Sequence, residues 1–569
     1  MTFESPAEHA EQAASVLAPE SGLLADPDIA GLARALGLVF RGALGHPAEA
    51  ATAWARYALR LAQIPPAALS SWLGGPAAPP VQLDPKDRRF ADRTWSGNPA
   101  FHALRMSYQA FADVMDETIT AAKLDRMQDT KARLITSLLV DALAPTNFLA
   151  TNPAALKAAL ETGGASVAKG TRNFIDDLRH NGGRPRQVDT SPFVFGQNLA
   201  ATPAKVVYRN ELMELLQYLP QTPQVHQTPM LCSPPWINKY YVMDLAPRRS
   251  FIEWAVQHER TVFAISYRNP SADMSGVTMD DYLIHGPRQA LEVIRQITGA
   301  DTVDIVGLCL GGALTAITDA YLMATGQEEI GNLTLLNTML DYSEPGVLGA
   351  FTDMDTIQRL EQKMAREGGL AGKTMSLTFD VLRANDLIFN YVVSNWLLGQ
   401  DPPAFDILAW NSDSTRMPAA MHAFYLRNFY AENRLAQDQL MLGGKLIKLS
   451  DVKHPAYIVG AENDHIVPWK SAYASTRLLS GPVRYVLSSG GHIAGIVNPP
   501  GPKGWYVVGS DHPASADEWR QQATRHDGSW WEDWAAWSAG NSGPLTDPPP
   551  TGSDKYSALY DGPGQYVRS

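Results

Sequence analysis

The chain has 569 residues, more than a single typical domain, and its 45% hydrophobic residues suffice for a sizeable core. Its 47 Lys and Arg against 59 Asp and Glu give a net charge of -12 without a basic run, which disfavours nucleic-acid binding. Only Cys232 and Cys309 are present, so a disulfide framework is excluded and a reducing compartment is favoured.

The N-terminal residues show no sign of export or membrane insertion. Residues 1–20 are acidic and lack the charged and apolar regions of a secretory signal. The longest apolar stretch, 305–317, is too short to span a bilayer. We therefore expect a cytoplasmic protein without a transmembrane segment.

Residues 1–200 show helical patterns and no convincing strand, which predicts an all-α N-terminal domain. One helix is predicted over 47–64, and Pro65 and Pro66 should end it because proline has no N–H to donate. The polar segment 163–189 is interpreted as a linker.

A second helix should begin at Asn98, an N-cap residue followed by Pro99 at the first helical position. It carries an apolar stripe on one face, made of Phe101, Leu104, Tyr108, Phe111 and Met115. Stripes of this kind need a surface to pack on. The catalytic core or a neighbouring helix is the simplest such surface, and a hydrophobic granule or a partner protein is the alternative.

From about residue 205 the pattern alternates between strand and helix, which predicts an α/β domain with a mostly parallel sheet covered on both faces. The expected strands are 228–233, 261–267, 302–306, 332–337, 455–460 and 483–487. The alternation stops at 341–448, a mainly helical stretch that would form a lid or cap. The expected organisation is therefore a helical N-terminal domain at 1–200 and a catalytic domain at 201–569 that contains this insertion.

The strongest local signal is GLCLGG at 307–312, which follows a β-branched strand and precedes a helical pattern. It matches the G-x-S-x-G nucleophile elbow of α/β-hydrolases with cysteine in the serine position. Gly307 and Gly311 would remove side chains where the turn is too tight for them. Cys309 is thus the predicted nucleophile, and a buried structural cysteine is the alternative.

Two further residues follow in the chain order that this fold requires. Asp464 comes directly after the predicted strand 455–460, and His492 comes after the strand 483–487. They would serve as the orienting acid and the general base for Cys309. His465 competes for the role of base, but it directly follows the acid, so we assign it to support of the loop.

The oxyanion hole is expected to use the backbone amide of Leu310 and a second amide from the loop after the early strand. Trp236 and Ile237 are the candidates for that second donor, and simple closure of the core is the alternative role of their loop. No metal site is predicted. Cysteine suits exchange of an acyl group with a thioester such as acyl-CoA, and its thiol is far more acidic than a hydroxyl.

Motifs spread over nearly the whole chain resemble those of polyhydroxyalkanoate synthases. They are KDRRFADRTW at 86–95, APTNFLATNP at 144–153, VVYRNELMELLQY at 206–218, PPWINKYYVMDL at 234–245, GLCLGG at 307–312, WNSDST at 410–415, YLRN at 425–428, DHIVPW at 464–469, GHIAGIVNPP at 491–500 and GSWWEDWAAW at 528–537. The family's catalytic cysteine, aspartate and histidine fall on Cys309, Asp464 and His492.

The resemblance implies an α/β-hydrolase fold and an acyltransferase that polymerises (R)-3-hydroxyacyl-CoA into polyester and releases CoA. CoA thioester would be the substrate, and no cofactor is implied. It further implies a single-subunit enzyme of class I, which takes short-chain monomers. Such an enzyme would form a homodimer on polymer granules in the cytoplasm, together with granule-associated proteins. Two other classes stay open: a cysteine hydrolase or thioesterase that releases free hydroxy acid, and a noncatalytic granule-binding protein.

Overall fold

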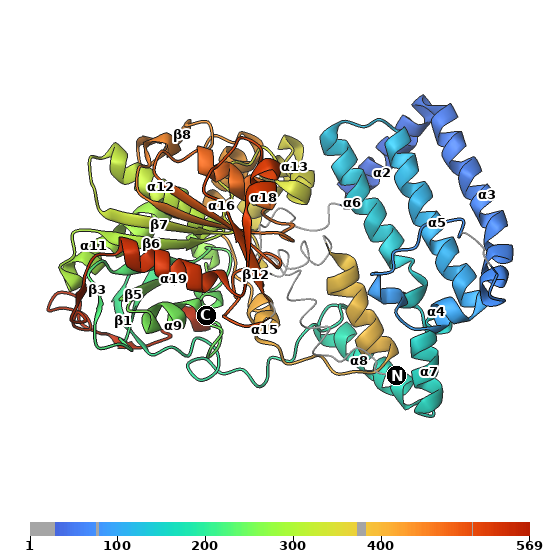
Figure 1. Ribbon diagram of the computed structural model, residues 1–569, viewed down its shortest axis with the longest axis horizontal. Helices are drawn as coiled ribbons and strands as arrows, with labels where there is room; N and C mark the ends of the chain where they lie inside the picture. The colour runs from blue at the N-terminus through green and yellow to red at the C-terminus, as the bar shows by residue number, and fades with distance from the viewer. Residues whose placement is uncertain (1–28, 76–78, 373–382, 503) are drawn as a thin grey trace. The chain divides into compact units, whose positions relative to one another are not determined.

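The computed structural model describes residues 29–75, 79–372, 383–502 and 504–569, which fall into two compact units (Figure 1). The first unit holds the described residues of Asp26–Asp189 and Leu377–Pro403. The second holds those of Thr190–Ser376 and Ala404–Ser569. Residues 1–20, for which no export signal is predicted, lie outside the described part of the chain.

The first unit is helical. Its α-helices are α2 (Ile29–Gly45), α3 (Pro47–Trp72), α4 (Thr94–Gly97), α5 (Pro99–Ala121), α6 (Arg126–Ala142), α7 (Pro153–Glu161) and α8 (Ala165–His180). Two π-helical turns from the second half of the chain complete it, η8 (Asn385–Phe389) and η9 (Val392–Leu397). A segment of the expected cap insertion is thus built into the same unit as the N-terminal helices.

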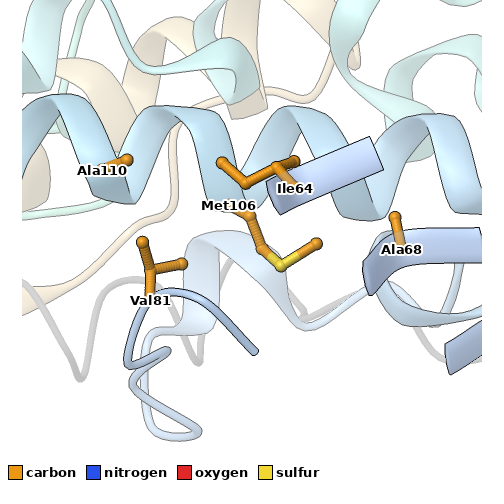
Figure 2. Close-up of a cluster of buried hydrophobic side chains, with 5 residues drawn as sticks. All are labelled: Ile64, Ala68, Val81, Met106 and Ala110. Carbon is orange, nitrogen blue, oxygen red and sulfur yellow. The ribbon is translucent and has the colours of Figure 1, made fainter. Parts of the chain in front are cut away.

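Helix α3 continues through the two prolines that were predicted to end it, so that prediction is wrong. Ile64 before them and Ala68 after them are only 1% and 2% exposed. Both pack in one cluster with Met106 and Ala110 of α5 and with Val81 (Figure 2). Burial of this apolar face on α5 stabilises the last turns of α3 and offsets the missing N–H donors.

The predicted start of α5 is confirmed. The Asn98 side-chain oxygen accepts hydrogen bonds from the amides of Ala100 and Phe101, and Pro99 occupies the first helical position. The apolar stripe packs inside the first unit, where Tyr108 is buried. The cluster around Tyr108 contains Phe90, Trp95, Val140 and Ala144, with Phe101, Leu104, Phe111 and Met115 packed against it.

The interpretation of 163–189 as a linker is wrong over Ala165–His180, which forms α8. A Cβ at Gly170 would lie 1.9 Å from the backbone oxygen of Trp396, so α8 and η9 make close contact at this glycine. The Trp396 indole donates a 2.8 Å hydrogen bond to Asp177, which is buried. The polar composition that indicated a linker therefore supplies partners for a segment about 220 positions away in sequence.

The second unit contains an eleven-stranded sheet in the order β13-β12-β11-β10-β7-β6-β4-β5-β2-β1-β15. Neighbours from β11 to β5 are parallel, and the strands outside them pair antiparallel. The strands are β1 (Ala204–Arg209), β2 (Met213–Tyr218), β4 (Met230–Ser233), β5 (Val262–Tyr267), β6 (Val303–Leu308), β7 (Ile330–Leu336), β10 (Ala456–Ala461), β11 (Val483–Ser488), β12 (Trp505–Val508), β13 (Thr524–Asp527) and β15 (Tyr560–Asp561). A separate pair joins β3 (Val225–His226) to β14 (Leu545–Thr546).

Every residue of β4, β5, β6 and β10 is buried, so both faces of the central sheet are covered, as the sequence predicts. Helix α12 (Leu310–Ala324) packs on β4, β6 and β7. Helices α9 (Phe251–Gln257) and α19 (Trp530–Asn541) pack on each other through Phe251 and three tryptophans. The other helices around the sheet are α10 (Met279–Leu283), α11 (Gln289–Thr298), α17 (Trp469–Ala474) and α18 (Ala516–Gln522).

The insertion between β7 and β10 contributes short elements to the second unit. They are α13 (Met354–Glu367), α15 (Asp406–Ser412), α16 (Ala419–Tyr425), the π-helical turn η10 (Leu426–Ala431) and the hairpin of β8 (Leu440–Leu442) and β9 (Lys445–Ile447). No helix in the described ranges is both long and apolar enough to traverse a bilayer.

Candidate active site

Cys309 lies at the junction between β6 and α12, as the GLCLGG pattern predicts. Strand β6 ends at Leu308, α12 begins at Leu310, and Cys309 between them has φ 52° and ψ -114°. A positive φ is strained for a residue with a side chain, and such strain is found at functional turns. The turn places the sulfur beside the N-terminus of α12, where free amides favour negative charge.

Gly307 and Gly311 are required because no side chain would fit at these positions, as the pattern indicates. A Cβ at Gly307 would lie 2.5 Å from the Cα of Gly312, and one at Gly311 would lie 2.1 Å from the backbone oxygen of Ser233. Gly312 also lacks room, since its Cβ would lie 1.9 Å from the hydroxyl of Thr338. The G-x-S-x-G pattern does not require glycine at 312, because the contact that excludes a side chain there comes from Thr338, which lies just after β7.

Asp464 and His492 come together at the carboxyl edge of the sheet. Asp464 follows β10 and His492 follows β11, which are adjacent parallel strands. His492 Nδ1 lies 2.5 Å from Oδ2 of Asp464. The other oxygen of Asp464 accepts hydrogen bonds of 2.9 Å from the amides of Ile466 and Val467, so the carboxylate is held on both sides.

The imidazole of His492 lies close enough to Cys309 for the two side chains to interact electrostatically. No hydrogen-bond partner lies within bonding distance of Nε2 among the described residues, and both side chains are buried. Burial disfavours the charged imidazolium, yet the Asp464 carboxylate and the Cys309 sulfur raise the pKa of His492 to about 10. The surroundings therefore stabilise the protonated imidazole that results when a proton moves from sulfur to nitrogen.

His465 is half-buried and lies in the turn that also holds Asp464. Its backbone oxygen faces Gly346, where an added Cβ would lie 3.6 Å away. The Asp464 carboxylate contacts His492 and the amides of Ile466 and Val467. The support of the loop by His465 stays a prediction.

The residues predicted to supply the oxyanion donors belong to two segments, the start of α12 and the loop after β4. Leu310 is the first residue of α12, whose first amides have no acceptor within the helix. Trp236 and Ile237 are buried in the loop after β4. The carbonyl oxygens of Ser233, which ends β4, and of Pro234, which begins the loop, lie against Gly311. The start of α12 and the loop after β4 therefore lie against each other at Gly311, two residues after Cys309.

Asn337 is a site residue that sequence reasoning missed. It follows β7 with φ 42°, and its side-chain amide donates a 2.5 Å hydrogen bond to the backbone oxygen of His492. This bond ties the loop of the base to the strand next to the nucleophile. A polar residue directly after the buried run 333–336 is the signal that could have indicated it.

Cys309 is only 6% exposed, and buried aromatic side chains lie near it. Tyr342 and Tyr425 are buried close enough to Cys309 to interact with it electrostatically. Trp236 contacts Tyr425 edge-on at 5.8 Å between ring centroids. Burial raises the pKa of both tyrosines, so their hydroxyls stay neutral at physiological pH.

Among the residues that the structure describes, no three His, Cys, Asp or Glu side chains gather as metal ligands would. The structure places the thiol of Cys309 on a tight turn at the N-terminus of α12, near a histidine that is paired with a carboxylate. Together these groups suit nucleophilic acyl transfer.

The order of the strands in the sheet and the turn at Cys309 define an α/β-hydrolase fold. Residues 207–499 match the family model described as alpha/beta hydrolase fold. Residues 86–255 match the model described as Poly-beta-hydroxybutyrate polymerase (PhaC) N-terminus. The chain belongs to the family of poly(3-hydroxyalkanoate) polymerases.

Relatives of this family match the chain over most of its length. A poly(3-hydroxyalkanoate) polymerase of Methylorubrum extorquens is 40% identical, over 99% of this chain and 94% of that relative. The poly(3-hydroxyalkanoate) polymerase subunit PhaC of Cupriavidus necator is 41% identical, over 85% and 83%. Poly(3-hydroxyalkanoate) polymerase 1 of Ectopseudomonas oleovorans is 37% identical, over 93% of each.

Proposed function

We propose that this protein polymerises (R)-3-hydroxyacyl-CoA into polyhydroxyalkanoate with release of CoA. The observation that carries the proposal is the placement of Cys309 on a strained elbow next to the buried His492–Asp464 pair, in a chain of the polymerase family. Short-chain monomers are proposed from the family resemblance. The reaction calls for no cofactor, because the cysteine itself carries the acyl group.

In the proposed reaction, His492 accepts the proton of Cys309 and the thiolate attacks the thioester carbonyl. The amide of Leu310 and one amide of Trp236 or Ile237 stabilise the oxyanion. Its collapse breaks the bond to the CoA sulfur, and CoA leaves with the proton from His492. A 3-hydroxyl then attacks the acyl group on Cys309, and its proton passes to His492. Collapse of this second tetrahedral intermediate forms the new ester and breaks the bond to the Cys309 sulfur, which regains the proton from His492.

Measuring CoA release together with insoluble polyester tests the proposal, with short and medium 3-hydroxyacyl-CoA and with Cys309→Ala. We expect the parent to form both products and Cys309→Ala to form neither. Free hydroxy acid as the sole product would instead identify a hydrolase or thioesterase. Affinity for polymer without thiol-dependent CoA release would identify a noncatalytic granule-binding protein.

The proposed cellular setting is the surface of polymer granules in the cytoplasm, together with granule-associated proteins and as a homodimer. Large apolar side chains on the first unit support contact with an apolar polymer. Phe40 and Leu44 of α2 and Leu59 and Trp72 of α3 are each more than half exposed. Sedimentation of the protein together with isolated granules would measure granule binding. Sedimentation of the free protein would measure the number of subunits.

A further inference from the structure

The WNSDST motif at 410–415 lies in the cap insertion, and the chemistry described so far gives it no role. Its residues contact the loop 234–239, here called the oxyanion loop because it carries Trp236 and Ile237. Strand β4 ends at Ser233, so the backbone groups of the oxyanion loop have no place in the sheet ladder. The motif supplies partners in place of the sheet.

Several contacts join the two segments. The Thr415 hydroxyl donates a 2.5 Å hydrogen bond to the backbone oxygen of Ile237. The Trp410 indole donates a 2.9 Å hydrogen bond to the backbone oxygen of Lys239. Asn238 and Ser414 form an antiparallel backbone bridge.

An ion pair between Lys239 and Asp413 adds to these contacts. The Lys239 ammonium group is buried and lies 2.8 Å from a carboxylate oxygen of Asp413. The hydroxyl of Tyr241, just beyond the oxyanion loop, donates to the other oxygen of Asp413 at 3.1 Å. At the other end of the oxyanion loop, Pro234 and the preceding Ser233 of β4 lie against Gly311 of α12. The loop is therefore held between the elbow and the 410–415 segment.

We propose that Thr415 is a positioning residue that holds the oxyanion loop in register with Cys309. This inference rests on the proposed function, because it assigns the second oxyanion donor to this loop. Thr415 fixes the carbonyl of Ile237 and so limits rotation of the backbone that presents the amides of Trp236 and Ile237. A donor must lie within a few tenths of an ångström of its place to stabilise an oxyanion, since small displacements reduce the rate strongly.

Two reactions of the same sulfur separate this role from a general effect on the fold. Acylation of Cys309 by 3-hydroxybutyryl-CoA or by p-nitrophenyl acetate passes through a tetrahedral oxyanion. Alkylation by iodoacetamide does not, because the sulfur displaces iodide from carbon directly. The experiment compares single-turnover acylation with both acyl donors against the alkylation rate, in the parent, Thr415→Val and Thr415→Ser.

We expect Thr415→Val to slow acylation roughly 10- to 100-fold with both donors and to change alkylation less than twofold. Thr415→Ser should restore most of the acylation rate because it keeps the hydroxyl. Thr318→Val is the matched control, since buried Thr318 also donates to a backbone carbonyl, that of Leu314 inside α12. It should leave the ratio of the two reactions unchanged.

Unchanged acylation in Thr415→Val would overturn the inference, and so would an equal loss of acylation and alkylation. A parent that reacts with p-nitrophenyl acetate but not with the CoA thioester would refute the proposed polymerase function. In that case the p-nitrophenyl acetate series still decides the role of Thr415.

Discussion

His492 Nδ1 and Asp464 Oδ2 lie 2.5 Å apart in a site where both side chains are buried. The carboxylate is fixed by two amides and the imidazole by its own loop, which Asn337 ties to β7. In the proposed reaction, this pairing keeps a proton on Nδ1 of His492 and leaves Nε2 to accept the proton of Cys309.

Asp464→Asn should lower CoA release by up to roughly 10⁴-fold with little change in folding, because the amide favours the wrong tautomer of His492. Single-turnover CoA release measures this loss. An activity within tenfold of the parent would show that the carboxylate does not orient the base. Circular dichroism of the variant serves as the folding control.

Substitution of His492 and substitution of His465 should differ sharply in their effect on the rate of CoA release. His492→Gln removes the proposed base and should reduce CoA release by at least about a hundredfold. His465→Gln is the matched control and should keep most of the rate, because its proposed role is to support the loop. Full rate in His492→Gln together with loss in His465→Gln would reverse the assignment.

Gly311→Ala should abolish activity and destabilise the second unit, because the new methyl group would lie 2.1 Å from the Ser233 oxygen. Gly540→Ala makes the same change in α19, where a Cβ meets nothing within 4 Å. We expect this control to keep full activity and to be as stable as the parent or slightly more so. CoA release measures the activity of both variants, and thermal unfolding measures their stability. Equal activity and stability of Gly311→Ala and Gly540→Ala would contradict the steric argument.

Asp244 should make the second unit less stable as pH rises from about 4 to 7. Burial raises the pKa of this carboxyl from 3.8 to about 7, although the hydroxyls of Thr202, Ser250 and Tyr218 donate to it. Since the folded state binds the proton more tightly, it loses roughly 1.4 kcal/mol per pH unit in this window and nothing more above it.

Asp244→Asn carries no proton to lose, so its unfolding free energy should depend less on pH between 4 and 7 than that of the parent. Denaturant unfolding at several pH values measures the difference between the two proteins. An identical slope in parent and variant would show that Asp244 does not titrate in this range.

Met106→Ala should destabilise the first unit by about 2–5 kcal/mol, because Met106 is fully buried between α3 and α5 (Figure 2). Met106→Leu keeps most of the volume and should lose less than about 1.5 kcal/mol. Hydrogen exchange of the amides in α3 and α5 reports on this unit specifically. Unchanged exchange in Met106→Ala would mean that this cluster does not hold the two helices together.

Local chemistry made much of the site predictable. The strained elbow needs glycine at 307 and 311 whatever surrounds it, and parallel strands bring residues after β10 and β11 to one edge of the sheet. The six predicted strands of the catalytic domain all appear as β4, β5, β6, β7, β10 and β11. Continuous apolar runs predict them because strands buried on both faces need no alternation.

The features that could not be predicted depend on contacts between segments that are distant in sequence. Helix α3 passes Pro65 and Pro66 because α5 covers its apolar face, and α8 forms where a linker was expected because residues 383–403 pack on it. Gly312 is required by Thr338, Asn337 reaches the loop of His492, and Thr415 reaches Ile237 across 178 positions. Local backbone geometry was enough to predict the turn at Cys309, and the chain order of the fold was enough to predict Asp464 and His492 as its candidate partners. The polar side chains that hold this candidate site in place could not be predicted, because their hydrogen bonds exist only after distant segments have packed together.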